Sequence, residues 1–113
     1  MTLRPDSQPG DAYGWVVNQA GHAAIVGVGL AGLLIWLPPV MASLIATAVY
    51  FIVWEWAYQI VTLGSKLYRD AAADTLNVGL GAGMAAAVGP EPVFWALWAG
   101  WVVVLLIGAG YRR

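Results

Sequence analysis

Three ionisable side chains stand inside apolar stretches of this sequence, where a buried charge is unfavourable. Glu55 lies within the apolar run VYFIVWEWAYQIV at residues 49–61. His22 and Asp74 occupy similar places in two other apolar stretches. Ionisable residues within membrane-spanning segments are rare and tend to be functional rather than structural. We therefore predict a functional pocket that contains a histidine, a glutamate and an aspartate.

Further polar residues extend each of these positions along one face of a helix. Side chains four residues apart on a helix are neighbours. The resulting stripes are Asn18 with His22, Glu55 with Gln59, and Asp70 with Asp74 and Asn77. Each of three helices thus presents one polar stripe, and we expect the stripes to face one another. Glu55 would then point toward His22 and Asp74 rather than toward lipid.

The composition indicates which elements must position these stripes. Of the 113 residues, 61% are hydrophobic and only 10% are charged, whereas soluble domains are nearer half apolar and a quarter charged. The predicted fold is therefore all-α, a polytopic bundle of four transmembrane helices in one domain over residues 13–113. Proline, glycine and charged residues separate the four apolar segments, which are about 13–37, 40–63, 71–88 and 93–111.

The third segment, 71–88, is short and only mildly apolar, so three spanning helices with a re-entrant or interfacial third segment are the alternative. The basic residues favour four crossings. With four, all Lys and Arg residues fall on one side, which the positive-inside rule makes the cytoplasmic side: Arg4, Lys66, Arg69, Arg112 and Arg113. Both termini are then cytoplasmic, residues 1–12 form a flexible polar tail, and the polar stripes lie in the cytoplasmic half of the bilayer.

Small and aromatic residues suggest how the helices pack. Gly79 and Gly83 form a G-x-x-x-G pattern, which permits close approach between two helices. The segment 93–111 offers no polar side chain at the level of the stripes, so we expect this helix to cover the outside of the bundle. Five tryptophans fit anchoring at the membrane interface or against lipid: Trp15, Trp36, Trp95, Trp98 and Trp101.

Several kinds of chemistry find little support. The chain has no cysteine, which excludes disulfides, thiolate ligands and a cysteine nucleophile. Its net charge of -1 offers no basic surface for nucleic acid. A metal site at His22, Glu55 and Asp74 is an alternative, since nitrogen and oxygen ligands suit Zn, Fe or Mn, but no local metal motif accompanies the single histidine. We therefore predict no cofactor and assign no catalytic residue, and whether the protein is an enzyme is left open.

The order of the polar motifs along the chain resembles that of the VanZ-like membrane proteins. The motifs are GH at 21–22, EWAYQ at 55–59 and YRDAAADTLNVGLGAG at 68–83. The resemblance implies a compact helical bundle with these polar positions facing inward, and a role at the bacterial envelope. The matching positions are His22, Glu55, Gln59, Arg69, Asp74, Asn77 and Gly81.

The stripes and the resemblance lead to one functional hypothesis. We predict a multi-pass protein of the bacterial inner membrane, bacterial or phage-encoded, whose buried pocket binds a lipid-linked or small amphiphilic ligand. The residues expected at this pocket are His22, Glu55, Gln59, Asp74, Asn77, Asn18, Asp70 and Arg69. A holin-like permeabilising protein and an accessory subunit of a larger membrane complex are the alternatives. The expected partners are membrane lipids and a second copy of the chain or another membrane protein, but not nucleic acid.

Overall fold

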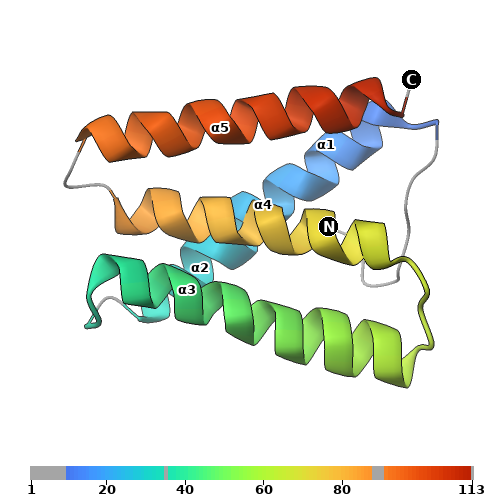
Figure 1. The fold of residues 1–113 in the computed structure, drawn as a ribbon, viewed down its shortest axis with the longest axis horizontal. Helices are drawn as coiled ribbons and strands as arrows, with labels where there is room; N and C mark the ends of the chain where they lie inside the picture. Colours follow the sequence, from blue (N-terminus) through green and yellow to red (C-terminus); the bar gives the residue numbers. More distant parts are fainter. Residues whose placement is uncertain (1–9, 35, 88–90, 113) are drawn as a thin grey trace.

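The computed structural model describes residues 10–34, 36–87 and 91–112, and over these residues every regular element is helical (Figure 1). Two long helices change along their length from α-helical to π-helical winding, in which hydrogen bonds join residues five apart instead of four. The continuous run α1–η1–α2 is called the first helix, and α3–η2 the second. The elements are α1 (Ala12–Gly21), η1 (His22–Gly27), α2 (Val28–Leu33), α3 (Pro39–Tyr50), η2 (Phe51–Thr62), α4 (Tyr68–Ala86) and α5 (Glu91–Gly110).

The ends of the first helix follow from residues with clear backbone preferences. The Asp11 carboxylate accepts a hydrogen bond of 2.8 Å from the Gly14 backbone N–H, an N-cap that satisfies a donor left open at the helix start. The helix ends at Leu33, short of the predicted end at residue 37. A proline disfavours helical backbone in the residue before it. Pro39 then stands in the first turn of α3, where its missing N–H does no harm.

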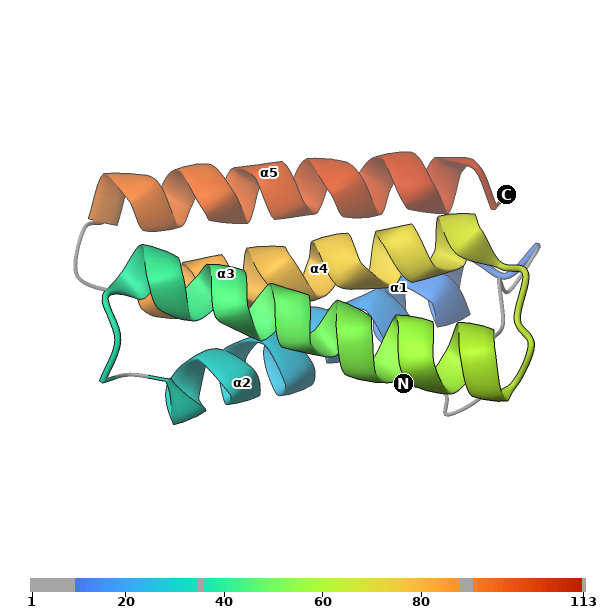
Figure 2. The ribbon, with the colours of Figure 1, turned by 60° about the horizontal axis from the view of Figure 1, so that its bottom comes forward.

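The helix α4 lies at the centre of the bundle (Figures 1 and 2). It packs against the first helix, against α3 and against α5. It begins at Tyr68, ahead of the predicted start at 71, after a connection in which Gly64 adopts a positive φ of 68°. Because its neighbours cover it, α4 tolerates a less apolar sequence than they have: its small residues fill the space between helices, and its polar residues face protein.

The contact between α4 and the first helix excludes side chains at two glycines. A Cβ atom on Gly81 would collide with the backbone of Ala23. A Cβ atom on Gly27 would collide with the backbone carbonyl oxygen of Val78. Glycine at both positions therefore allows the two backbones to touch directly, as small residues do at helix interfaces in membranes.

The glycines of the predicted G-x-x-x-G pattern lie on other sides of α4. A Cβ atom on Gly79 would lie 3.1 Å from the Thr47 hydroxyl oxygen on α3. A Cβ atom on Gly83 would lie 3.3 Å from a methyl carbon of Leu97 on α5. Both neighbours are side-chain atoms rather than backbone. The two glycines thus pack against different helices, and the direct backbone contact uses Gly81 instead.

Three of the described helices are long and apolar enough to cross a membrane, as in a multi-pass membrane protein: Ala12–Leu33, Pro39–Thr62 and Pro92–Gly110. The most apolar of the three, within α5, has no buried residue in its spanning window and packs on α4 and α1 from outside. Apolar surface left exposed in this way matches a lipid environment. The helix α4, with 19 residues, is not among the three and carries two aspartates near its start.

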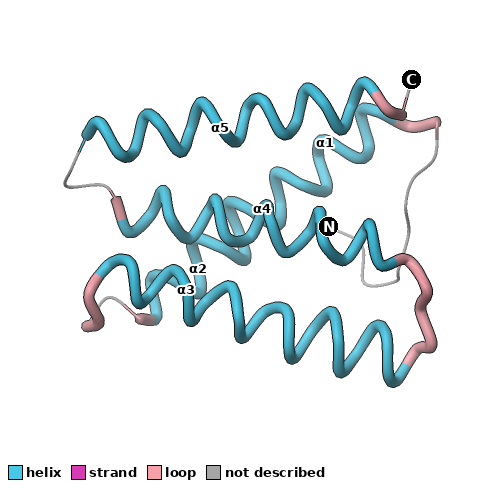
Figure 3. The backbone as a smooth tube through the Cα atoms, viewed as in Figure 1, coloured by secondary structure: helices cyan, strands magenta, loops and turns pink. Residues whose placement is uncertain are grey.

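The start of α1, the connection from η2 to α4 and the end of α5 lie at the same end of the bundle (Figure 3). There the Arg112 guanidinium lies over the Trp15 ring, 4.2 Å from its centroid, and donates a hydrogen bond of 3.2 Å to the Gly108 carbonyl. Trp15 is only 2% exposed. The prediction that Trp15 anchors the protein at the membrane interface is therefore wrong, because this indole fills the space between α1 and α5.

The backbone contact at Gly81 predicts a position-specific effect of alanine. Gly81→Ala should destabilise the bundle by about 1–3 kcal/mol, because the added methyl group must push apart two backbones. Gly29→Ala is the matched control, since a Cβ atom there would meet nothing within 4 Å. Thermal unfolding in mild detergent should show a lower midpoint for the first variant and an unchanged or higher one for the second. Equal midpoints would contradict this account of the contact.

Candidate functional site

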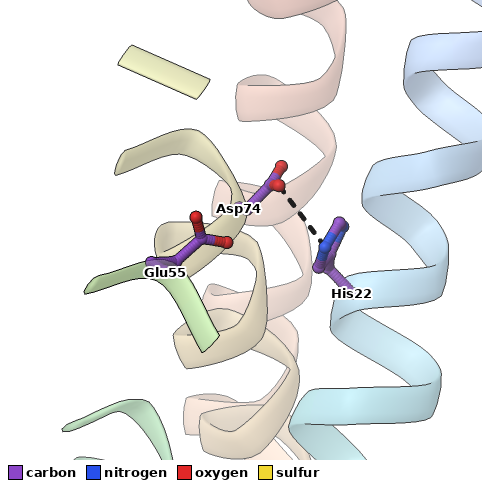
Figure 4. Close-up of side chains that lie close together, drawn as sticks. All are labelled: His22, Glu55 and Asp74. Atoms are coloured by element: carbon purple, nitrogen blue, oxygen red, sulfur yellow. Dashed lines mark ion pairs between the residues drawn. The ribbon is translucent and has the colours of Figure 1, made fainter. Parts of the chain in front are cut away.

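Three side chains from three helices converge in the interior of the bundle (Figure 4). His22 is the first residue of η1, Glu55 belongs to η2 and Asp74 to α4. Their exposures are 1%, 0% and 3%. One ring nitrogen or carboxylate oxygen from each lies within 4.8 Å of those from the others. These three residues are called the buried cluster, and in it Glu55 faces protein rather than lipid.

The His22 ring is held in a defined orientation. Its Nδ1 lies 3.0 Å from the backbone carbonyl oxygen of Asn18, one turn earlier on the same helix. A carbonyl can only accept, so Nδ1 carries the proton in this hydrogen bond. The other ring nitrogen, Nε2, lies 3.4 Å from Asp74 Oδ2. The Tyr50 ring packs edge-on against the imidazole, with centroids 5.8 Å apart. His22 therefore presents Nε2 to the aspartate.

Glu55 owes its orientation to the π-helical winding of η2. It follows Tyr50 by five residues, a spacing that separates two side chains by about 140° on an α-helix. Winding with bonds between residues five apart brings such a pair to one side. The Tyr50 hydroxyl donates a hydrogen bond of 2.5 Å to Glu55 Oε1. The second oxygen, Oε2, is buried and has no hydrogen-bond partner among the described residues.

Asp74 is positioned by the first helix. The Gln19 side-chain amide Nε2 donates a hydrogen bond of 2.5 Å to Asp74 Oδ1. Gln19 is itself fully buried. The remaining oxygen, Oδ2, is the one that faces His22. Asp74 thus joins α4 to the first helix through two contacts, about two helical turns before Gly81 on α4.

Asn77, which was expected at the pocket, turns toward α5. Its Nδ2 donates a hydrogen bond of 2.9 Å to the Ala73 carbonyl, and its Oδ1 accepts one of 2.9 Å from Trp101 Nε1. The expectation that α5 contributes no polar group at this level is therefore wrong, because the Trp101 indole N–H is a donor. Asn77 links α4 to α5 through this hydrogen bond from Trp101, and it does not belong to the buried cluster.

Of the other predicted site residues, three are buried and one is exposed. Asn18 is buried and supplies the carbonyl that orients the histidine. Gln59 is buried on η2. Asp70 is buried at the start of α4, one turn before Asp74, while the neighbouring Arg69 is exposed.

A cleft of about 950 Å³ opens between α1, α4 and α5, at the end of the bundle where α5 finishes. Asp70 lines this cleft, whereas His22, Glu55 and Asp74 do not. The charged residues around it are Lys66, Arg69, Asp70 and Arg112. The apolar residues include Trp15, Leu76, Val104 and Ile107. The cleft is therefore amphipathic, with cationic groups from two helix ends beside an apolar wall.

Two side chains that hold the buried cluster in place were not predicted as site residues. Gln19 stands three residues before His22, a spacing that puts both on one face of a helix, so the sequence did contain a signal for it. Tyr50 carried no such signal. Its position five residues before Glu55 points elsewhere on an α-helix, and only the π-helical winding brings it to the carboxylate.

Comparisons of the chain with protein-family models, with curated proteins and with solved structures found no match. The fold and the site therefore define a class of protein rather than a family. That class is a multi-pass helical membrane protein with a buried His–Glu–Asp cluster. The resemblance to VanZ-like proteins stays a prediction.

Removing the Tyr50 hydroxyl should lower the stability of the folded protein without changing the shape of the site. Tyr50→Phe leaves Glu55 without its hydrogen-bond donor, and an unsatisfied buried acceptor costs about 1–3 kcal/mol. Tyr58→Phe is the matched control, because Tyr58 is 38% exposed and contacts Trp54 through its ring. Thermal unfolding in detergent should separate the two variants. If Tyr58→Phe is destabilised as much as Tyr50→Phe, the hydroxyl of Tyr50 has no special role.

Proposed function

We propose that this chain is a multi-pass protein of the bacterial cytoplasmic membrane that binds a phosphate-bearing amphiphile in the cleft between α1, α4 and α5. Four helices cross the bilayer in this proposal, α4 included, with both ends of the chain on the cytoplasmic side. The single observation that carries it is the amphipathic lining of the cleft.

The topology is supported by where the basic residues of the described chain lie. Lys66, Arg69 and Arg112 all line the same cleft, so they share one end of the bundle. Positive charge gathered on one side marks the cytoplasmic face of a membrane protein. Arg4 and Arg113, which entered the same argument from the sequence, lie outside the described residues. A central α4 that is covered by its neighbours can cross the bilayer despite Asp70 and Asp74.

The ligand class follows from the two halves of the cleft wall. Lys66 and Arg69 are exposed at its rim, where they offer cationic hydrogen-bond donors to an anionic headgroup. Leu76, Val104 and Ile107 supply the apolar part of the wall, which suits a hydrocarbon chain. A molecule with a phosphate at one end and an acyl or isoprenoid chain at the other matches both halves.

The placement in a bacterial envelope rests on the resemblance to VanZ-like proteins rather than on the cleft. The resemblance implies that the histidine of the first helix, the glutamate of the second and the aspartate of α4 all face inward. Lipid is the partner that the exposed apolar side chains of α5 and the second helix require, since water would not solvate them favourably. A lipid-linked ligand reaches the cleft from the surrounding lipid.

Filling the cleft should weaken lipid binding. Native mass spectrometry of the purified protein with dihexanoyl phosphatidylglycerol should show one bound lipid, and dihexanoyl phosphatidylcholine should bind less because its headgroup carries no net charge. Leu76→Trp should lower the bound fraction at least tenfold by occupying the apolar wall. Leu44→Trp is the matched control, since Leu44 is exposed on α3 and does not line the cleft.

A charge test complements the steric one. Lys66→Gln combined with Arg69→Gln should reduce the preference for phosphatidylglycerol over phosphatidylcholine while leaving the thermal midpoint near that of the unaltered protein, because both side chains are exposed. Equal binding of the two lipids by the unaltered protein, or equal loss in Leu76→Trp and Leu44→Trp, would overturn the proposed site.

A further inference from the structure

We propose that His22, Glu55 and Asp74 bind a divalent transition-metal ion between the first helix, the second helix and α4. The proposal does not depend on the amphiphile cleft, which is lined by other side chains. It rests on how the donor atoms of the buried cluster are divided between supporting contacts and a shared centre.

Each of the three side chains has one polar atom engaged by a supporting group and another that is available. His22 uses Nδ1 for the Asn18 carbonyl and presents Nε2. Asp74 uses Oδ1 for Gln19 and presents Oδ2. Glu55 uses Oε1 for the Tyr50 hydroxyl, and its buried Oε2 has no hydrogen-bond partner in the described part of the chain. Metal ligands in proteins are oriented by outer hydrogen bonds of this kind.

The histidine is in the state that a metal requires. Its Nδ1 carries the proton that the Asn18 carbonyl accepts, so the lone pair of the neutral ring lies on Nε2. That lone pair faces a carboxylate oxygen. Two electron-rich atoms facing each other repel unless a proton or a cation lies between them, so the arrangement calls for a positive centre.

The distance between His22 Nε2 and Asp74 Oδ2 favours a metal ion over a shared proton. It is 3.4 Å, whereas a charge-assisted hydrogen bond between such atoms is shorter, at about 2.7–2.9 Å. Bonds of about 2.0–2.1 Å to a tetrahedral ion place neighbouring ligand atoms roughly 3.3 Å apart. Glu55 needs a modest adjustment to complete the set, since the donor atoms span up to 4.8 Å.

The balance of charge in the buried cluster also favours a metal ion. Two carboxylates that are 0% and 3% exposed would bring two negative charges into the bundle, and an isolated buried charge is strongly unfavourable. A protonated His22 would neutralise one of them. A divalent ion bound by a neutral histidine neutralises both, and one nitrogen with two oxygen donors suits Zn²⁺, Fe²⁺ or Mn²⁺ better than Mg²⁺ or Ca²⁺.

Metal content of the purified protein tests the proposal directly. The full chain, stripped with a chelator in mild detergent and re-equilibrated with Zn²⁺, Mn²⁺ or Fe²⁺ in turn, should retain one ion of at least one kind per chain by mass spectrometry. Asp74→Asn and Glu55→Gln should each lower retention at least tenfold. Asp70→Asn is the matched control, because it makes the same change one turn earlier on α4 and should retain the ion.

Two further measurements keep the test decisive if a cluster variant folds poorly. The bound ion should raise the thermal midpoint of the unaltered protein and of Asp70→Asn, because a ligand that binds the folded state stabilises it. Gln19→Leu removes a supporting contact without removing a ligand and should weaken affinity by about 10–100-fold. Absence of a stoichiometric ion from the unaltered protein with all three metals would overturn the proposal, as would equal loss in Asp70→Asn and Asp74→Asn.

Discussion

The direct contact between the backbones of α4 and the first helix is the constraint on which the rest of this structure depends. Gly27 and Gly81 have no side chain between them and the opposing helix, and any larger residue would separate the two backbones. At that separation, side chains of the first helix reach α4. Gln19 and His22 then both contact Asp74. The packing of small residues and the polar site are thus two parts of one interface.

The second helix contributes to the same site through its backbone winding rather than through glycines. Its C-terminal half is π-helical, and this winding directs Tyr50 and Glu55 to the same side. Stretches of π-helix are rare and are often found at functional sites. The first helix also changes to π-helical winding at His22, the residue that it contributes to the buried cluster. The backbone therefore departs from regular α-helix in both helices where they supply a cluster residue.

Much of this arrangement was accessible from the sequence. Helical periodicity placed His22, Glu55 and Asp74 on inward faces, because an ionisable group in an apolar run has few other places to go. Helical periodicity could not predict the π-helical winding of the second helix. The hydrogen bond between Tyr50 and Glu55 depends on this winding, and no residue pattern indicated it. The backbone contact at Gly81 was likewise hidden, since Gly79 and Gly83 fit the known motif better. Trp15 and Trp101 were misjudged because tryptophan at a membrane boundary and tryptophan in a helix interface look alike in sequence.

The division of the buried cluster among three helices has a consequence for how the bundle holds together. The contacts of His22 and Asp74 extend beyond their own helices: His22 Nε2 faces Asp74 on α4, and Asp74 contacts Gln19 and His22 on the first helix. The helix α4 shows this most clearly, because its Asp74 and Asn77 both accept hydrogen bonds from side chains of neighbouring helices. The packing that surrounds α4 with the first helix, α3 and α5 is therefore also the packing that assembles the site.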